Sequence, residues 1–106
     1  MTAENLTALL AKRVLKWSVA PDRFLTGNRG WVSRNRFRPT ERVQDAFKLL
    51  IAAAPAEYDF GGAKGKPSWA KVRIGTVSAE ASAPSLPLAI CLAIAKALGI
   101  EVGACE

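Results

Sequence analysis

The sequence SLPLAICLAIAKALG at residues 85–99 is the most apolar stretch of this 106-residue chain. Its interior has only two polar residues, Cys91 and Lys96. Ser85 suits the N-cap of a helix, and Gly99 suits its C-terminal stop. A helix that is apolar on almost every side is buried on two sides or lies in a subunit interface. The stretch therefore predicts either a layered fold around this helix or a homodimer formed through it.

Two amphipathic helices are expected upstream, at residues 2–17 and 40–54. Their apolar residues recur at intervals of three and four, which is the period of one helical face. Thr40 is the expected N-cap of the second helix, because it precedes an acidic first turn. The predicted buried faces are Leu6, Leu9, Leu10, Val14 and Trp17 in the first helix, and Val43, Ala46, Phe47, Leu50, Ile51 and Ala54 in the second.

Residues 57–61 and 68–80 have the alternating pattern of two strands of a hairpin. Ala70, Val72 and Ile74 are expected on one face of the second strand. The connection between the strands is rich in glycine and proline, which predicts an exposed turn. Gly75 lies inside the second pattern and is expected to mark a bulge or bend.

The order helix, basic segment, helix, strand, strand, helix indicates the α+β class. We expect one domain, residues 1–106, with a small antiparallel sheet of two or three strands packed between helices. The C-terminal helix is expected in residues 82–98, after a short linker rich in serine, alanine and proline. A chain of this length is long enough for one core.

Composition excludes several classes of function. No apolar run approaches the roughly 18–20 residues that span a bilayer, and the N-terminus lacks the basic start of a secretory signal, so the cytoplasm is expected. Histidine is absent, and the two cysteines, Cys91 and Cys105, are far apart. The usual zinc sites therefore cannot form, and neither a disulfide nor a cofactor is expected.

Enzymatic activity is not expected either. The turn at residues 61–67 departs from the phosphate-loop pattern, because Pro67 stands where that pattern needs a hydroxyl. Glu57 and Asp59, which offer a weak alternative as catalytic carboxylates, are more simply solubilising groups, as are Glu41 and Asp45. A serine or cysteine nucleophile such as Ser33 or Cys105 would lack a histidine base.

The sequence RFLTGNRGWVSRNRFRPTER at residues 23–42, called the arginine segment below, concentrates the charge. It holds six arginines and one acid, a formal charge of +5, while the whole chain carries +6. Both a short strand and a long ordered loop are compatible with it. Its candidate residues for binding a polyanion or a partner are Arg23, Arg29, Trp31, Arg34, Arg36, Arg38 and Arg42.

Arginine matches phosphate and carboxylate geometry and stacks on aromatic rings. Phe24, Trp31 and Phe37 are either stacking platforms for bases or core anchors of the segment. If six arginines neutralised phosphates of duplex DNA, affinity would fall with a log–log salt slope of about −5. Some arginines are alternatively expected to pair with the chain's own acids, namely Asp22, Glu41, Asp45 and Glu57.

The chain resembles the phage ABA-sandwich family, which is similar to the NinX-type phage proteins. The resemblance covers most of the chain and lies in LLAKRVLKW, PTERVQDAFKLLIAA, SWAKVRI and SLPLAICLAIAKALG. It implies a three-layer helix–sheet–helix fold and a phage or prophage origin, and it implies no catalytic residues. The dense arginine segment departs from the family pattern.

Two functions follow as hypotheses. The first is a phage-encoded, non-enzymatic binding protein that blocks a host protein or nucleoprotein complex. A nucleic-acid-guided defence complex of the host is one example. The second is a phage accessory protein that contacts DNA or RNA phosphates directly.

Overall fold

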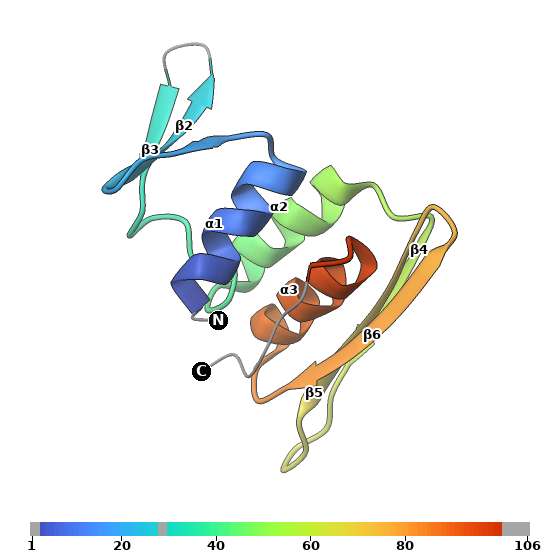
Figure 1. Cartoon of the computed structure of the whole chain (residues 1–106). Coiled ribbons are helices and arrows are strands. Elements are labelled where there is room, and N and C mark those ends of the chain that lie inside the picture. Colours follow the sequence, from blue (N-terminus) through green and yellow to red (C-terminus); the bar gives the residue numbers. More distant parts are fainter. Residues whose placement is uncertain (1–2, 28–29, 101–106) are drawn as a thin grey trace.

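The computed structural model describes residues 3–27 and 30–100, and within them the chain forms three helices and two antiparallel sheets (Figure 1). The predicted α+β class is confirmed. None of the helices in these residues combines the length and apolar character needed to cross a membrane. The elements are α1 (Ala3–Val14), β1 (Ser18–Val19), β2 (Arg23–Gly27), β3 (Gly30–Ser33), α2 (Val43–Ala53), β4 (Glu57–Gly61), β5 (Ser68–Ile74), β6 (Val77–Ala83) and α3 (Leu86–Ala97).

The apolar C-terminal helix α3 lies in the middle of the molecule. One side packs on β5 and β6, and the other side packs on α2, with α1 beyond (Figure 1). Burial on two sides, one of the two outcomes expected from its composition, is therefore what the structure shows, while a homodimer stays a prediction. Gly99 ends the segment with φ at +75°, a conformation that glycine adopts without strain. The buried residues of α3 are Ala89, Ile90, Cys91, Ala93, Ile94, Ala95 and Ala97.

The larger sheet has the order β4-β5-β6, with β5 in the centre. Ala70 and Val72 are buried beneath α3, with Ile74 half-buried on the same face, as their alternation predicts. The second predicted strand, residues 68–80, is in fact two strands joined by a turn at Gly75 and Thr76. Gly75 has φ at +63°, and Ile74 pairs with Val77 across the turn. The bend expected at Gly75 is therefore a complete chain reversal.

The smaller sheet has the order β1-β2-β3, and the sequence did not predict it as a sheet. The start of the arginine segment forms a hairpin of β2 and β3, hereafter the N-terminal hairpin, which projects from the helices (Figure 1). The proposed strand alternation from Trp31 to Phe37 continues only to Ser33. Arg34–Arg36 turn instead, with the Arg36 amide donating to the Ser33 carbonyl at 2.9 Å.

Three aromatic rings attach the N-terminal hairpin to the helices. Trp17, Phe24 and Phe37 lie with their ring centroids 5.0 to 5.8 Å apart. All three are buried, so Phe24 and Phe37 are core residues and not platforms for bases. The two contacts of Phe37 are edge-to-face and add to the stability that the buried area of the rings provides.

The helix boundaries and one buried face differ from the expectations. The first helix ends at Val14, and Trp17 is buried from the loop that follows. The second begins at Val43, with Arg42 at the N-cap in place of Thr40. Ile51 is 78% exposed, because the face that packs on α3 consists of Ala46, Leu49 and Leu50, at intervals of three and four.

Candidate binding surface

The N-terminal hairpin has one buried face and one exposed face. Leu25 pairs with Trp31, and Arg23 pairs with Ser33, so all four side chains lie on the same face of the sheet. Phe24 and its partner Val32 lie on the opposite, inward face. Trp31 is 58% exposed and Leu25 is 45% exposed. We call Arg23, Leu25 and Trp31 the outer face of the hairpin.

Arg23 is held in place on this outer face. Its guanidinium carbon lies 4.9 Å from the centroid of the Trp31 ring. Its Nε and Nη2 donate to the two carboxylate oxygens of Asp22 at 3.1 and 2.9 Å. The hydrogen bond from Arg23 lowers the pKa of the Asp22 carboxyl below its usual value, and the same bond raises the pKa of Arg23. The positive charge of Arg23 is therefore largely offset within the chain.

Arg34 fastens the base of the hairpin. Its Nη1 donates to the Ala20 carbonyl at 3.1 Å, and its guanidinium carbon lies 5.2 Å from the centroid of Phe24. The side chain bridges the loop before β2 and the turn after β3, and it is half-buried. These contacts give the Arg34 side chain a structural role.

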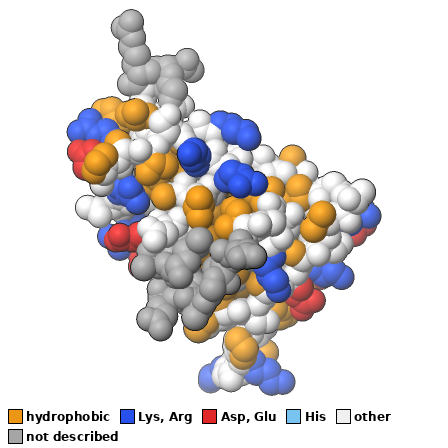
Figure 2. Space-filling model, viewed as in Figure 1, with side chains coloured by type: hydrophobic (Ala, Val, Ile, Leu, Met, Phe, Trp, Pro, Cys, Tyr) orange, Lys and Arg blue, Asp and Glu red, His pale blue; other side chains and the backbone are white. Residues whose placement is uncertain are grey.

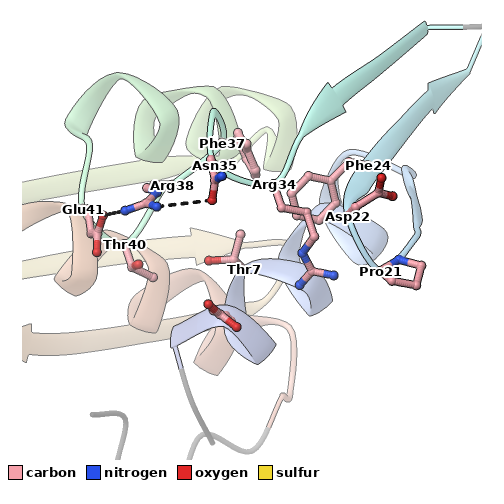
Figure 3. Close-up of a pocket in the computed structure, with 11 residues that line it drawn as sticks. Thr7, Pro21, Asp22, Phe24, Arg34, Asn35, Phe37, Arg38, Thr40 and Glu41 are labelled. Atoms are coloured by element: carbon pink, nitrogen blue, oxygen red, sulfur yellow. Dashed lines mark hydrogen bonds and ion pairs between the residues drawn. The ribbon is translucent and has the colours of Figure 1, made fainter.

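Arg38 is paired inside the chain as well (Figure 3). Its Nη1 donates to Glu41 at 3.0 Å, and its Nη2 donates to Asn35 at 3.4 Å. Its backbone amide donates to Asp45 at 2.9 Å. The prediction that some arginines pair with the chain's own acids is thus confirmed for Asp22 and Glu41. Asp45 instead accepts from a backbone amide, and Glu57 pairs with an arginine of β5 at 3.3 Å.

Arg36 and Arg42 are the exposed, unpaired cations of the segment. Within residues 3–27 and 30–100, their side chains make no hydrogen bond and no ion pair. Arg29 lies outside the residues that the structure describes. The six predicted residues that the structure describes therefore divide into a stacked pair, two internally bonded arginines and two arginines that face solvent.

The structure adds Leu25 to the predicted residues. Phe24 and Leu25 are adjacent and both apolar, so the sequence alone gives no reason to place one inward and the other outward. The strand register, in which Leu25 pairs with Trp31, places the Leu25 side chain on the outer face. Around the hairpin, Figure 2 shows hydrophobic side chains beside basic and acidic ones.

The carboxylates of β4 do not gather into a site. Glu57 pairs with Arg73, and Asp59 accepts a hydrogen bond from the Phe60 amide at 2.9 Å. Both side chains are exposed. Across the described part of the chain, no three acidic or cysteine side chains are grouped so as to hold a metal ion.

Comparisons with known proteins agree on the architecture. The model of the phage ABA sandwich domain matches residues 8–94. A crystal structure of a phage protein from Bacillus cereus is similar, with a TM-score of 0.77 and 15% sequence identity. That similarity covers 97% of this chain and 93% of the other. No curated protein matches the sequence.

Proposed function

The chain belongs to the phage ABA sandwich family, and we propose that it is a non-enzymatic protein that binds and blocks a host protein. The contact surface is the outer face of the N-terminal hairpin, and the partner presents acidic side chains around an apolar cleft. The complex forms in the cytoplasm of the infected cell.

The stack of Arg23 on Trp31 beside Leu25 carries this proposal. Tryptophan and arginine are the residue types most enriched among those that dominate binding energy in protein interfaces. Arg23 is already ordered by Asp22, so little side-chain freedom remains to be lost on binding. An exposed indole next to an exposed leucine also has no role in the core of this chain.

Charge supports an acidic partner. The chain carries +6, and Arg36, just beyond β3, has no internal partner among the described residues. Such cations at the rim of an interface speed association and favour a partner of opposite charge. They contribute less to affinity than the desolvated centre.

Direct binding of a nucleic acid is the second candidate, and the exposed indole of Trp31 favours it as a base platform. The number of arginines available to neutralise phosphates is smaller than the sequence suggested. Among the arginines of the segment that the structure describes, only Arg36 and Arg42 are unpaired, and two neutralised phosphates would give a log–log salt slope on duplex DNA of about −2. Phe24 and Phe37, the other two predicted platforms, are buried.

The test compares Trp31→Ala with Ile51→Ser, which removes an even more exposed apolar side chain from α2. Each protein is used to capture host proteins, and the captured partner is then purified and titrated. We expect an acidic partner whose affinity falls at least about tenfold in Trp31→Ala and is unchanged in Ile51→Ser. Equal binding by Trp31→Ala, or tight binding of single-stranded DNA or RNA with no protein partner, would refute the proposal.

A further inference from the structure

Four basic side chains gather around the C-terminal end of α1. Lys12 and Arg13 lie in its last turn, and Lys16 follows two residues after the helix ends. Lys48 of α2 reaches the same end, because its Nζ lies 5.0 Å from the centroid of the Trp17 ring, and Trp17 directly follows Lys16. All four basic side chains are exposed. We call Lys12, Arg13, Lys16 and Lys48 the basic cluster.

No acid of the described residues neutralises the basic cluster. None of its side chains takes part in an ion pair within residues 3–27 and 30–100. Arg13 donates a hydrogen bond to the Leu98 carbonyl at 3.5 Å, which leaves its charge uncompensated. In Figure 2, basic side chains gather over this end of α1 with no acidic side chain among them. The cluster therefore differs from Arg23 and Arg38, whose charges are offset by acids.

The dipole of α1 accounts for only a small part of this arrangement. The C-terminal end of a helix carries the equivalent of roughly half a negative charge, which favours cations in the last turn. Four cations exceed that charge several times over. The excess positive charge of the cluster is therefore available to a ligand.

The basic cluster lacks the features of a protein interface and of a single-strand groove. In the described part of the chain, none of the exposed large apolar side chains lies on α1, and the exposed aromatic ones are Trp31 on β3 and Tyr58 on β4. Protein interfaces have an apolar and aromatic centre. Proteins that bind single strands offer exposed rings on which bases stack. A surface of charge alone instead suits the regular phosphate rows of a duplex.

The packing of α1 also disfavours a lipid surface as the ligand. A helix that binds in the membrane interface buries its apolar face among the lipids. The apolar face of α1 is already used inside the protein, where Leu6 and Leu10 are fully buried. The exposed side of α1 therefore has charge to offer and no apolar face to insert.

We propose that the basic cluster binds the phosphate backbone of duplex DNA without preference for base sequence. Lysine contacts phosphates as a point charge on a flexible stem, and Arg13 keeps N–H donors beyond the one that bonds to Leu98. Four neutralised phosphates would give a log–log salt slope between about −3 and −4. The cluster shares no residue with the outer face of the hairpin, and this inference does not rest on the proposed function.

The test is a fluorescence anisotropy titration of two labelled DNA duplexes of unrelated sequence, between about 50 and 200 mM salt. We expect the intact chain to bind both duplexes equally, with the slope given above. The double variant Lys12→Gln with Lys16→Gln removes half of the cluster. Its slope is expected to be shallower by about 2, and its affinity at low salt at least about tenfold lower.

The matched control is Lys64→Gln with Lys66→Gln, which removes the same charge from the turn between β4 and β5, far from α1 (Figure 1). Both lysines are exposed, and their side chains make no hydrogen bond or ion pair within residues 3–27 and 30–100. We expect this control to keep the slope of the unchanged chain. Circular dichroism checks that both double variants fold.

Three results would overturn the proposal. The first is no binding of either duplex at about 100 μM protein and low salt. The second is an equal change of slope in the two double variants, which would indicate an effect of net charge and not of a site. The third is binding of vesicles that contain phosphatidylserine by a chain that does not bind DNA.

Failure of this proposal is separable from failure of the proposed function. Trp31→Ala is expected to bind duplex DNA normally, because Trp31 lies on the outer face of the hairpin. The variant Lys12→Gln with Lys16→Gln is expected to capture the host protein as the unchanged chain does. Loss of DNA binding in Trp31→Ala would place the DNA site on the hairpin and would also overturn the inference.

Discussion

The guanidinium carbon of Arg23 lies 4.9 Å from the centre of the Trp31 ring, across two paired strands of a hairpin that projects from the body of the protein. Asp22 holds the same guanidinium through two hydrogen bonds. The order of this exposed stack comes from the adjacent acid and from the strand pairing. An indole held in this way is ready to make contact without prior rearrangement.

The Asp22 carboxyl is expected to titrate below its ordinary pKa of 3.8, because Arg23 donates hydrogen bonds to its ionised form. With the folded-state pKa depressed, the stabilisation from the pair is present above the ordinary pKa and lost as the pH falls through the folded value. NMR titration of the carboxyl carbon measures this midpoint. Arg23→Gln should move it back upward, and an unchanged midpoint in that variant would show that Arg23 is not the cause.

Phe24→Ala is expected to destabilise the fold by about 3–5 kcal/mol, because it removes a buried ring that contacts Trp17 and Phe37. Urea unfolding followed by circular dichroism measures the change. Trp31→Ala, which removes an exposed ring from the same hairpin, serves as the comparison. Its effect is expected to stay within about 0.5 kcal/mol. Equal losses would mean that the outer face supports the fold.

Much of the fold could be predicted from the sequence, because burial imposes a period on the residues. The near-absence of polar residues from 86 to 98 indicated a helix that is either buried on two sides or part of a subunit interface, and burial on two sides is observed. The alternation of Ala70, Val72 and Ile74 indicated the buried face of a strand correctly. In both cases the local pattern alone distinguishes inside from outside.

The candidate site was less predictable, because tertiary pairing determines it. Trp31 and Phe37 have the same hydrophobic character, yet one is exposed and the other completes a core of three rings. The arginine segment gave no indication of which guanidinium would find an acid. Asp22 pairs with Arg23 as its neighbour, whereas Arg34 reaches a carbonyl 14 residues away. Only the fold brings the latter pair together.

Gly75→Ala is expected to cost about 1–2 kcal/mol, because φ at +63° is strained for any residue with a Cβ. No atom lies within 4 Å of the position that the new Cβ would occupy, so the cost is conformational and not a clash. Gly75→Asn should lose less, since asparagine tolerates the left-handed region better. Thermal unfolding of the two variants separates the effects, and a larger loss in Gly75→Asn would contradict this account.

Arg34 and Arg36 stand two positions apart and are expected to behave differently when their charge is removed. Arg34→Gln breaks the bond to the Ala20 carbonyl and the contact with Phe24, so we expect a loss of about 1–3 kcal/mol in unfolding free energy. Arg36→Gln removes no internal bond and is expected to change stability by less than about 0.5 kcal/mol. In partner binding, Arg36→Gln should instead slow association and weaken its salt dependence. Stopped-flow kinetics at two salt concentrations, beside urea unfolding, measure both effects. If Arg36→Gln destabilises the fold as much as Arg34→Gln, then the division of the segment into bonded and solvent-facing arginines is wrong, because both side chains would then be part of the framework.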